Sequence, residues 1–234
     1  TLTLSPNLTT VGDSAFYGCS NLSGVLTIPA SLTSIGPSAF MSGKFTEFVV
    51  ASGNSAYMSE DGVLYNKSQT LLVSYPIAKT DTSFVVPESV IELGANAFYD
   101  SQYLTSITIP SNLQIIGGGA IANCTNLTGG LVIPQTVTYI GMHPFYRSGF
   151  TSFSIDNDYY TTLGGVLYDA DMTTLIQYPT GKPDTSFTVP NSVTTIDSYT
   201  FYGAKNITSI TIPSSVTSIA DSAFYGCSNL DIVI

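Results

Sequence analysis

Residues 209–230 read SITIPSSVTSIADSAFYGCSNL, and the rest of the chain repeats, shortens or interrupts this unit. Ile210 and Ile212 are one residue apart, so both side chains point to one face of a short strand. Pro213 ends that strand, because proline has no N–H for a ladder and holds its predecessor in an extended conformation. The remainder of the unit lacks helical periodicity. We therefore expect a strand, a turn, a second short strand and up to one helical turn in each unit.

An apolar pair with the spacing of Ile210 and Ile212 recurs along the whole chain. Successive pairs are 22–24 residues apart, except at two longer intervals of 36 and 34 residues. Ten pairs enclose about nine coils of a solenoid, and strands stacked about 4.8 Å apart predict an elongated body of about 43 Å. The pairs are Leu2/Leu4, Leu26/Ile28, Phe48/Val50, Phe84/Val86, Ile107/Ile109, Leu131/Ile133, Phe153/Ile155, Phe187/Val189, Ile210/Ile212 and Ile232/Ile234.

Two further apolar positions keep the same register. A unit this small cannot bury its apolar edge alone, so each position is expected to form a continuous buried stack through neighbouring coils. The aliphatic position holds Val11, Ile35, Leu93, Ile116, Ile140, Ile196 and Ile219. The larger apolar position holds Phe16, Phe40, Phe98, Ile121, Phe145, Phe201 and Phe224.

The two longer coils, residues 55–84 and 158–187, resemble each other in sequence. In each, two apolar runs flank a polar turn, which predicts a β-hairpin that projects from the stack. We expect these hairpins near Val63–Val73 and Val166–Ile176, within insertions at about 55–83 and 158–186. Residues 1–234 are then a single solenoid domain. We expect it to be a fragment of a longer protein, because it begins inside one repeat and ends at the start of another.

The pattern I-x-I-P-x-x-V-x-x-I-x-x-x-A-F-x-x-C-x-x-L resembles the BspA-like leucine-rich repeats of bacterial surface proteins. The hairpin segments DGVLYNKSQTLLVSYP and GGVLYDADMTTLIQYP are also similar to segments of that family. The resemblance covers the whole chain and implies a right-handed, mainly β superhelix with a sheet on its concave face. It further implies an extracellular or cell-surface location and a role in adhesion. It carries no catalytic motif.

The composition disfavours several partners. Only 9% of the residues are charged, the net charge is −10, and the six Lys and Arg residues are scattered. Nucleic acids and anionic membrane surfaces are therefore poor partners. No apolar run is long enough to insert directly into a membrane.

Reactive residues do not assemble into a catalytic or metal site. The three cysteines recur several coils apart, at least about 14 Å from each other, so disulfides are not expected and small buried hydrophobes are. His143 is the only histidine and lacks partners for a zinc site or a triad. The acidic groups Asp156-Asn157-Asp158 and Asp169-Ala170-Asp171 could offer oxygens to calcium, although turn formation explains them more simply. We predict that the chain is not an enzyme and holds no cofactor or metal.

Aromatic residues gather in the hairpin coils. Strong protein-binding patches use such anchors, whereas the row between the strand pairs offers Thr, Ser and Val. The candidate ligand contacts are Tyr65, Tyr75, Tyr168 and Tyr178. The same rings could instead pack the hairpins onto the solenoid.

Three functions remain open at this point. We favour a non-enzymatic cell-surface or secreted repeat domain that mediates adhesion by binding an extracellular protein or a glycan, and we expect a monomer. The second is a structural spacer that displays another domain. The third is an accessory region of a larger extracellular enzyme.

Overall fold

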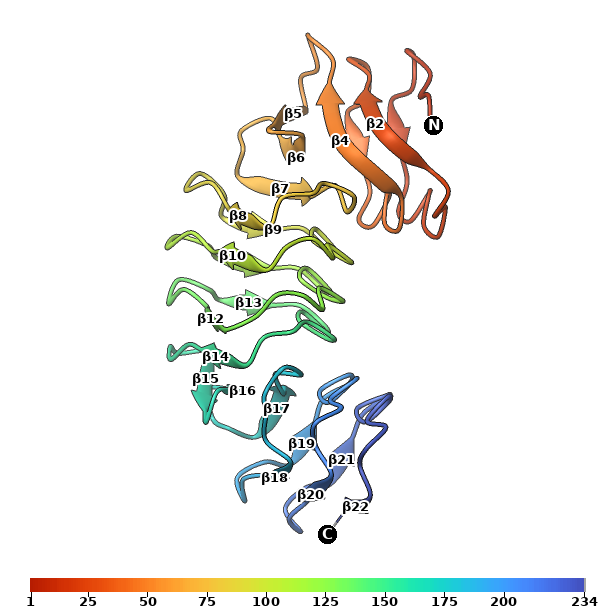
Figure 1. Cartoon of the computed structure of the whole chain (residues 1–234). Helices are drawn as coiled ribbons and strands as arrows, with labels where there is room; N and C mark the ends of the chain where they lie inside the picture. The colour runs from red at the N-terminus through yellow and green to blue at the C-terminus, as the bar shows by residue number, and fades with distance from the viewer. Residues whose placement is uncertain (234) are drawn as a thin grey trace.

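The computed structural model describes residues 1–233, and no helix is present in that range, neither a short one nor one that could cross a membrane. The chain forms an elongated stack of coils with its two termini at opposite ends (Figure 1). The predicted mainly β solenoid is thus confirmed. The final predicted pair is only partly covered, because Ile234 lies outside the described residues.

The first strand of each coil forms parallel ladders in the groups β2–β4, β8–β10, β12–β14 and β18–β20–β22. In the pairs from Leu2/Leu4 to Ile210/Ile212, the middle residue faces solvent, as Val85 and Val132 do at 68% and 72% exposure. Leu2 and Leu4, predicted to form the first rung, lie in no strand. The strands are β2 (Ser23–Ile28), β4 (Lys44–Val50), β8 (Ser83–Val85), β10 (Ser106–Thr108), β12 (Gly130–Val132), β14 (Ser152–Ser154), β18 (Ser186–Thr188), β20 (Ser209–Thr211) and β22 (Ile232–Val233).

The second strand of each coil forms a separate parallel ladder in the groups β1–β3, β7–β9–β11–β13 and β17–β19–β21. The first two groups end where a hairpin coil begins. These strands are β1 (Thr10–Val11), β3 (Ser34–Ile35), β7 (Leu71–Ser74), β9 (Glu92–Leu93), β11 (Ile115–Ile116), β13 (Tyr139–Ile140), β17 (Thr174–Gln177), β19 (Thr195–Ile196) and β21 (Ser218–Ile219).

A row of tight turns forms the third side of the stack, where the sequence suggested up to one helical turn. In residues 198–203, the N–H groups of Tyr199, Phe201 and Gly203 donate to carbonyl oxygens of the next coil at 2.8–3.3 Å. Backbone torsion φ is positive at the second and sixth turn residues, as in Tyr199 (57°) and Gly203 (76°). This alternation points the fourth residue, such as Phe201, into the core and the fifth outward.

The two hairpins are part of the stack and do not project from it, which corrects the expectation from the sequence. Strands β5 (Tyr57–Glu60), β6 (Val63–Asn66) and β7 form an antiparallel meander, and β7 then pairs in parallel with β9. Strands β15 (Tyr160–Leu163), β16 (Val166–Asp169) and β17 repeat this arrangement. The cause is that β6 and β16 are apolar on both faces, and their first three residues are all buried.

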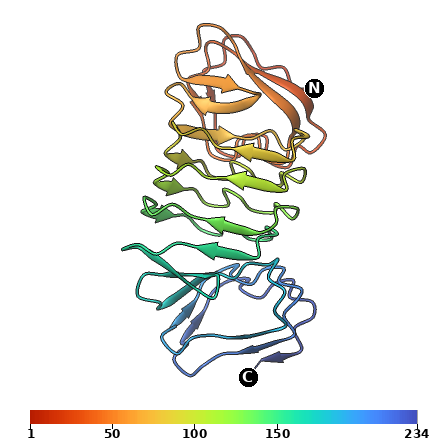
Figure 2. The same ribbon diagram turned by 60° about the vertical axis from the view of Figure 1, so that its left-hand side comes forward.

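The hairpin coils also lack the six-residue turn of the other coils. Only short turns at residues 77–78 and 180–181 stand in its place. Tyr75 and Tyr178 still donate their N–H groups to Ala97 and Thr200 of the next coil, at 2.7 and 3.0 Å. Figures 1 and 2 show that the stack changes direction at both hairpin coils. We call these two places the first and second junctions.

One asparagine and one tyrosine seal each junction. Asn54 donates to the carbonyl oxygens of Pro29 and Leu32 at 2.8 and 2.9 Å and accepts the N–H groups of two following residues. The Tyr57 hydroxyl accepts the N–H of Ile35, which closes the open edge of β3. Asn157 and Tyr160 repeat these roles at the second junction, where the Tyr160 hydroxyl accepts the N–H of Ile140.

The core runs along the stack, and aromatic rings stack between several neighbouring coils. The aliphatic row is not buried throughout, because Ile219 in the last coil is 50% exposed. Phe98, Ile121, Phe145 and Phe201 are at most 1% exposed. Phe201 stacks on Phe224 with ring centroids 4.9 Å apart. The terminal coils have one neighbour, so their members of the row, Phe16 and Phe224, are only partly buried.

The exposure of each cysteine also depends on the position of its coil in the stack. Cys124 is buried, whereas Cys227 is half-buried and Cys19 is exposed. The expectation that all three are buried is therefore wrong for Cys19, which lies in the first described coil. All three are free thiols, as expected.

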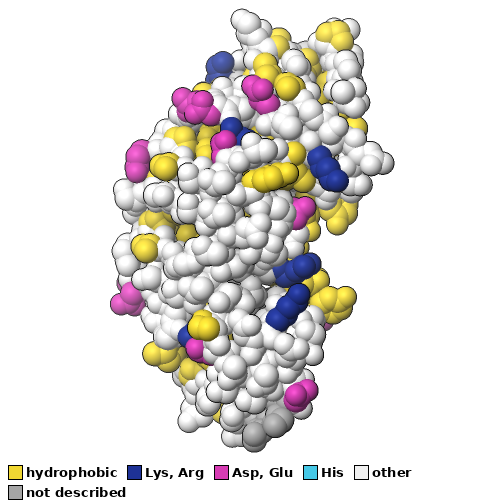
Figure 3. All heavy atoms as spheres, viewed as in Figure 1, with side chains coloured by type: hydrophobic (Ala, Val, Ile, Leu, Met, Phe, Trp, Pro, Cys, Tyr) yellow, Lys and Arg dark blue, Asp and Glu magenta, His cyan; other side chains and the backbone are white. Residues whose placement is uncertain are grey.

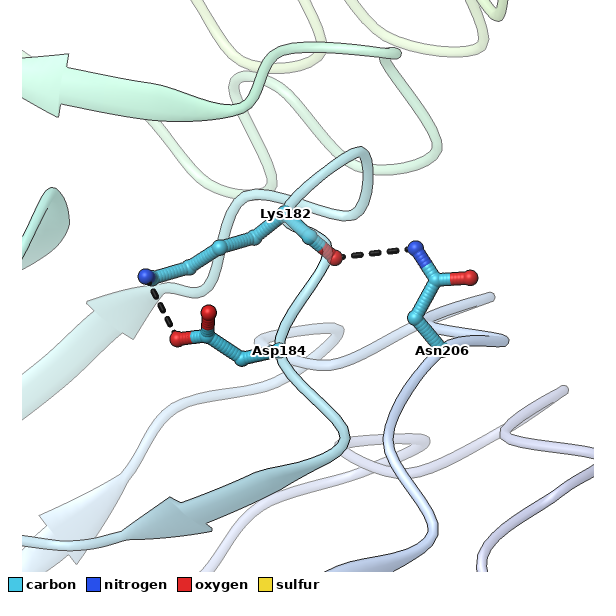
Figure 4. Close-up of polar contacts among 3 residues, drawn as sticks. All are labelled: Lys182, Asp184 and Asn206. Carbon is cyan, nitrogen blue, oxygen red and sulfur yellow. Dashed lines mark hydrogen bonds and ion pairs between the residues drawn. The ribbon is translucent and has the colours of Figure 1, made fainter.

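Ion pairs are few and local. Lys79–Asp81 and Lys182–Asp184, at 2.8 and 2.5 Å, are the ion pairs found within residues 1–233. Each joins two residues just after a hairpin. The carbonyl oxygen of Lys182 also accepts the side-chain amide of Asn206 from the next coil at 2.9 Å (Figure 4). The coils are therefore tied by amide side chains and backbone bonds more than by charge.

Candidate aromatic binding site

The four tyrosines predicted as ligand contacts lie in the core. Tyr65, Tyr75, Tyr168 and Tyr178 are each 1% exposed. Burial raises the pKa of all four phenols above the ordinary value. The structure therefore places these rings where the alternative interpretation put them, packing the hairpins, and does not present them to a ligand.

Two of these tyrosines extend the aromatic stack of the following coils up to the junctions. Tyr75 packs against Phe84 and Phe98 with centroid distances of 5.1 and 5.2 Å. Tyr178 makes the same contacts with Phe187 and Phe201 at 5.2 and 5.1 Å. They occupy the place that phenylalanine holds in the plain coils.

A different set of tyrosines reaches the surface. It occupies the fifth turn position, directly after the buried phenylalanine, and holds Tyr17, Tyr99, Tyr146, Tyr202 and Tyr225. Because the turn backbone alternates, these rings point outward and form a row along one side of the stack. Tyr202 and Tyr225, one coil apart, stack with centroids 4.9 Å apart. Tyr225 is 64% exposed, and Tyr146 and Tyr202 are half-buried.

The second junction gathers this row into a cluster. Because the hairpin coil has no large turn, the turns at residues 142–147 and 198–203 meet across it. Tyr146 lies 5.4 Å from both Tyr199 and Tyr202, measured between ring centroids. Tyr199 stacks on Tyr202 at 5.1 Å and contacts the imidazole of His143 at 4.2 Å. We call His143, Tyr146, Tyr199, Tyr202 and Tyr225 the aromatic platform.

The backbone under the platform is under strain. His143 and Tyr199 occupy the second turn position, with φ of 53° and 57°. A positive φ is uncommon for residues other than glycine and is unfavourable for bulky side chains. Other coils place Ser14, Ser38, Asn96, Gly119 and Ser222 there. At the second junction this turn position therefore carries two large rings in contact, whereas the other coils carry small side chains there.

A cation and polar groups border the platform. Arg147 is exposed, and its stem passes over Gly203, where an added Cβ would lie 3.1 Å from the arginine Cγ. The Nδ1 atom of His143 lies 3.3 Å from the carbonyl oxygen of Ser198. Charged residues make up only 9% of the chain, and on the face shown in Figure 3 they form scattered small groups. The platform therefore combines apolar ring faces, hydroxyl groups and one guanidinium.

The acidic groups considered for calcium have structural roles. Asn157 seals the second junction, and Asp169 accepts the N–H groups of Thr173 and Thr174 at 2.8 Å to close the hairpin turn. Within residues 1–233, no group of three His, Cys, Asp or Glu side chains is placed to hold a metal ion.

The sequence contained a signal for the platform that the prediction did not use. The dipeptide Phe-Tyr recurs in the repeat, and its phenylalanine alone entered the predicted core row. The recurrence of the tyrosine predicts a second row of rings beside it. The meeting of His143 and Tyr199 could not be anticipated, because it depends on the missing turn of the hairpin coil between them.

The ladders, the turn row and the surface rings define a β-solenoid of leucine-rich-repeat type with an aromatic surface site. A family model for the BspA type leucine rich repeat region matches residues 1–76, 78–181 and 181–234 in six copies, and the chain belongs to this family. Comparison with curated protein sequences gives no match.

Solved structures of bacterial proteins share the fold. A leucine-rich repeat protein from Eubacterium ventriosum is 25% identical, with a TM-score of 0.64 over 96% of this chain and 64% of its own. A leucine rich cell surface protein from Faecalibacterium prausnitzii is 24% identical, with a TM-score of 0.64 over 97% of this chain and 64% of its own. The pneumococcal vaccine antigen PcpA is 22% identical, with a TM-score of 0.63 over 97% of this chain and 56% of its own. The chain thus spans about three fifths of each of these proteins.

Proposed function

We propose that this chain is a non-enzymatic binding domain, secreted or displayed at the cell surface, that binds an extracellular protein or a glycan through the aromatic platform. The membership in the BspA-type repeat family and the neighbour described as a cell surface protein support this location. The observation that carries the proposal is the cluster of stacked, partly exposed rings on a hydrogen-bonded backbone.

The chemistry of the platform suits recognition of a surface ligand. Tyrosine offers a large amphipathic area at a low entropic cost, and tyrosine and arginine are frequent binding anchors. The ladder bonds hold Tyr199 and Tyr202 in place before any ligand arrives, because the N–H groups of Tyr199 and Phe201 are fixed to the next coil. A rigid, ordered site loses less entropy on binding than a mobile one.

The alternatives differ in what they leave unexplained. A spacer has no need for strained rings at His143 and Tyr199. An accessory region of a larger enzyme could use the same platform to hold a substrate, so this third function would place the same site in a different protein context.

Arrays of glycans and host proteins, probed with the isolated domain, test the proposal. The variant Tyr146→Ala/Tyr202→Ala should weaken binding to any array hit at least about tenfold. The matched control is Tyr103→Ala/Tyr159→Ala, which removes two tyrosines that are 52% and 53% exposed outside the platform. This control should bind as the parent does.

Two results would overturn the proposal. The first is the absence of any ligand on the arrays, which would leave the spacer function. The second is a platform variant that binds like the parent while Thr108→Asp and Thr188→Asp abolish binding. That outcome would move the site to the exposed face of the first ladder, where both threonines lie.

A further inference from the structure

A pocket of about 360 Å³ lies at the first junction, where the turn at residues 37–42 overhangs the outer face of strands β7, β9, β11 and β13. The buried rings of Phe40, Phe48 and Tyr75 contribute to its lining, and the more exposed Tyr99 and Tyr139 lie toward its rim. This volume falls within the range of small-molecule sites, which are mostly apolar with a few polar groups.

The second junction provides an internal comparison. In register, Ser38 corresponds to His143, Met41 to Tyr146, and Asn96 to Tyr199. At the second junction all three positions carry rings, and His143 and Tyr199 contact each other at 4.2 Å.

At the first junction the same positions carry small or flexible side chains. Asn96 donates its side-chain amide to the Ser38 hydroxyl at 2.7 Å, and Met41 lies beside them. All three residues line the pocket. The space that one junction fills with its own imidazole and phenol rings is thus left open in the other.

We propose that the pocket at the first junction binds a planar aromatic ring supplied by a ligand. Tyr99 and Tyr139 can stack on such a ring, and the Ser38–Asn96 pair supplies polar atoms for a ring heteroatom. This proposal does not depend on the function proposed for the aromatic platform.

Charge narrows the class of ligand. Glu92 is the one acidic residue in the lining, which holds no Lys, Arg or His, and the whole chain has a net charge of −10. A neutral or cationic ring is therefore favoured over an anionic one. The ring can belong to a free small molecule or to a side chain of a protein partner.

Titration of the whole domain with indole, tryptamine and indole-3-acetate, followed by two-dimensional amide NMR, tests the site and its charge preference. We expect saturable binding of indole and tryptamine, at least about tenfold weaker binding of indole-3-acetate, and shift changes centred on Ser38, Asn96, Tyr99 and Tyr139. A short neutral peptide with a central tryptophan distinguishes a ring of a protein side chain from a ring of a free small molecule. Tighter binding of the peptide assigns the ring to a partner's side chain, and tighter binding of indole assigns it to a small molecule.

Exchange of residues between the junctions gives the matched variants. Ser38→His/Met41→Tyr/Asn96→Tyr should fill the pocket and weaken indole binding at least about tenfold. The reverse variant, His143→Ser/Tyr146→Met/Tyr199→Asn, should open a second site and raise the stoichiometry from one to two.

The proposal is overturned if neither indole nor tryptamine binds saturably at millimolar concentration, or if the shift changes lie away from the first junction. It is also overturned if the filled variant folds and still binds indole as the parent does. The NMR mapping uses the unmodified chain, so the test remains decisive if a variant does not fold.

Discussion

Single residues decide how this repeat accommodates its irregular coils. Asn54 is 2% exposed and joins four backbone groups from two coils. The role of Asn157 at the second junction could not be predicted, because the neighbouring sequence does not show which carbonyl oxygens its amide contacts. The sequence marked Asn157 only as a member of an acidic group. Its role follows from the distance between coils, which only the folded stack sets.

Thiol reactivity should follow the position of each cysteine in the stack. Burial raises the pKa of the Cys124 thiol to about 12 and also raises that of Cys227, so little reactive thiolate is present at neutral pH. We expect a maleimide reagent at neutral pH to modify Cys19 quickly, Cys227 slowly and Cys124 only after unfolding. Mass spectrometry of the labelled peptides measures this order.

Labelling in denaturant is the control for the cysteine prediction. Labelling in denaturant should modify all three residues at similar rates, which removes differences in local sequence. Rapid labelling of Cys124 in the native protein would show that the central coils do not cover it.

At the scale of the element, the plain coil was predictable and the hairpin coil was predictable only in part. The apolar ladders follow from spacing alone, because each coil repeats the same register. The antiparallel strands also follow from alternating apolar runs and polar turns. Spacing alone does not show whether the hairpins project from the stack or lie within it. Three consecutive apolar residues, Val63, Leu64 and Tyr65, are nevertheless a sign that the strand is buried on both faces.

The position of each tyrosine depends on whether it follows a hairpin strand or lies in the turn of a plain coil. Tyr75 lies in the core because β7 joins the second ladder, whereas Tyr202 lies on the surface because its turn alternates inward and outward. Composition does not separate the two cases. The four tyrosines chosen from the sequence as ligand contacts are therefore buried, whereas those after the turn phenylalanines reach the surface.

The energetic cost of a core truncation should depend on the position of the coil. Phe98→Ala should lower the free energy of unfolding by about 3–5 kcal/mol, because the ring is buried between two neighbouring coils. Phe224→Ala should cost less, since its ring is only partly buried at the end of the stack. Urea denaturation of both variants and the parent gives the two values, and equal costs would contradict the difference in burial.

At the scale of the whole molecule, two hairpin coils divide the stack and create its irregular surfaces. Both junctions have the same asparagine and tyrosine seals, yet they differ in what fills the space beside them. The first leaves the pocket beside Asn96, and the second fills it with His143 and Tyr199. A regular solenoid would present neither feature, so the pocket and the contact between His143 and Tyr199 both arise from the interruptions of the repeat.

The platform and the pocket both require that the hairpin coils lie within the stack. Hydrogen exchange followed by mass spectrometry tests this directly, because the N–H groups of Tyr75 and Tyr178 are bonded to the next coil. Segments 71–75 and 174–178 should exchange as slowly as the central strands β9 and β11, while the exposed turns that precede them, near Ser68 and Asp171, exchange quickly. Exchange of 71–75 and 174–178 at the rate of those turns would show that the hairpins project from the stack and would contradict this account.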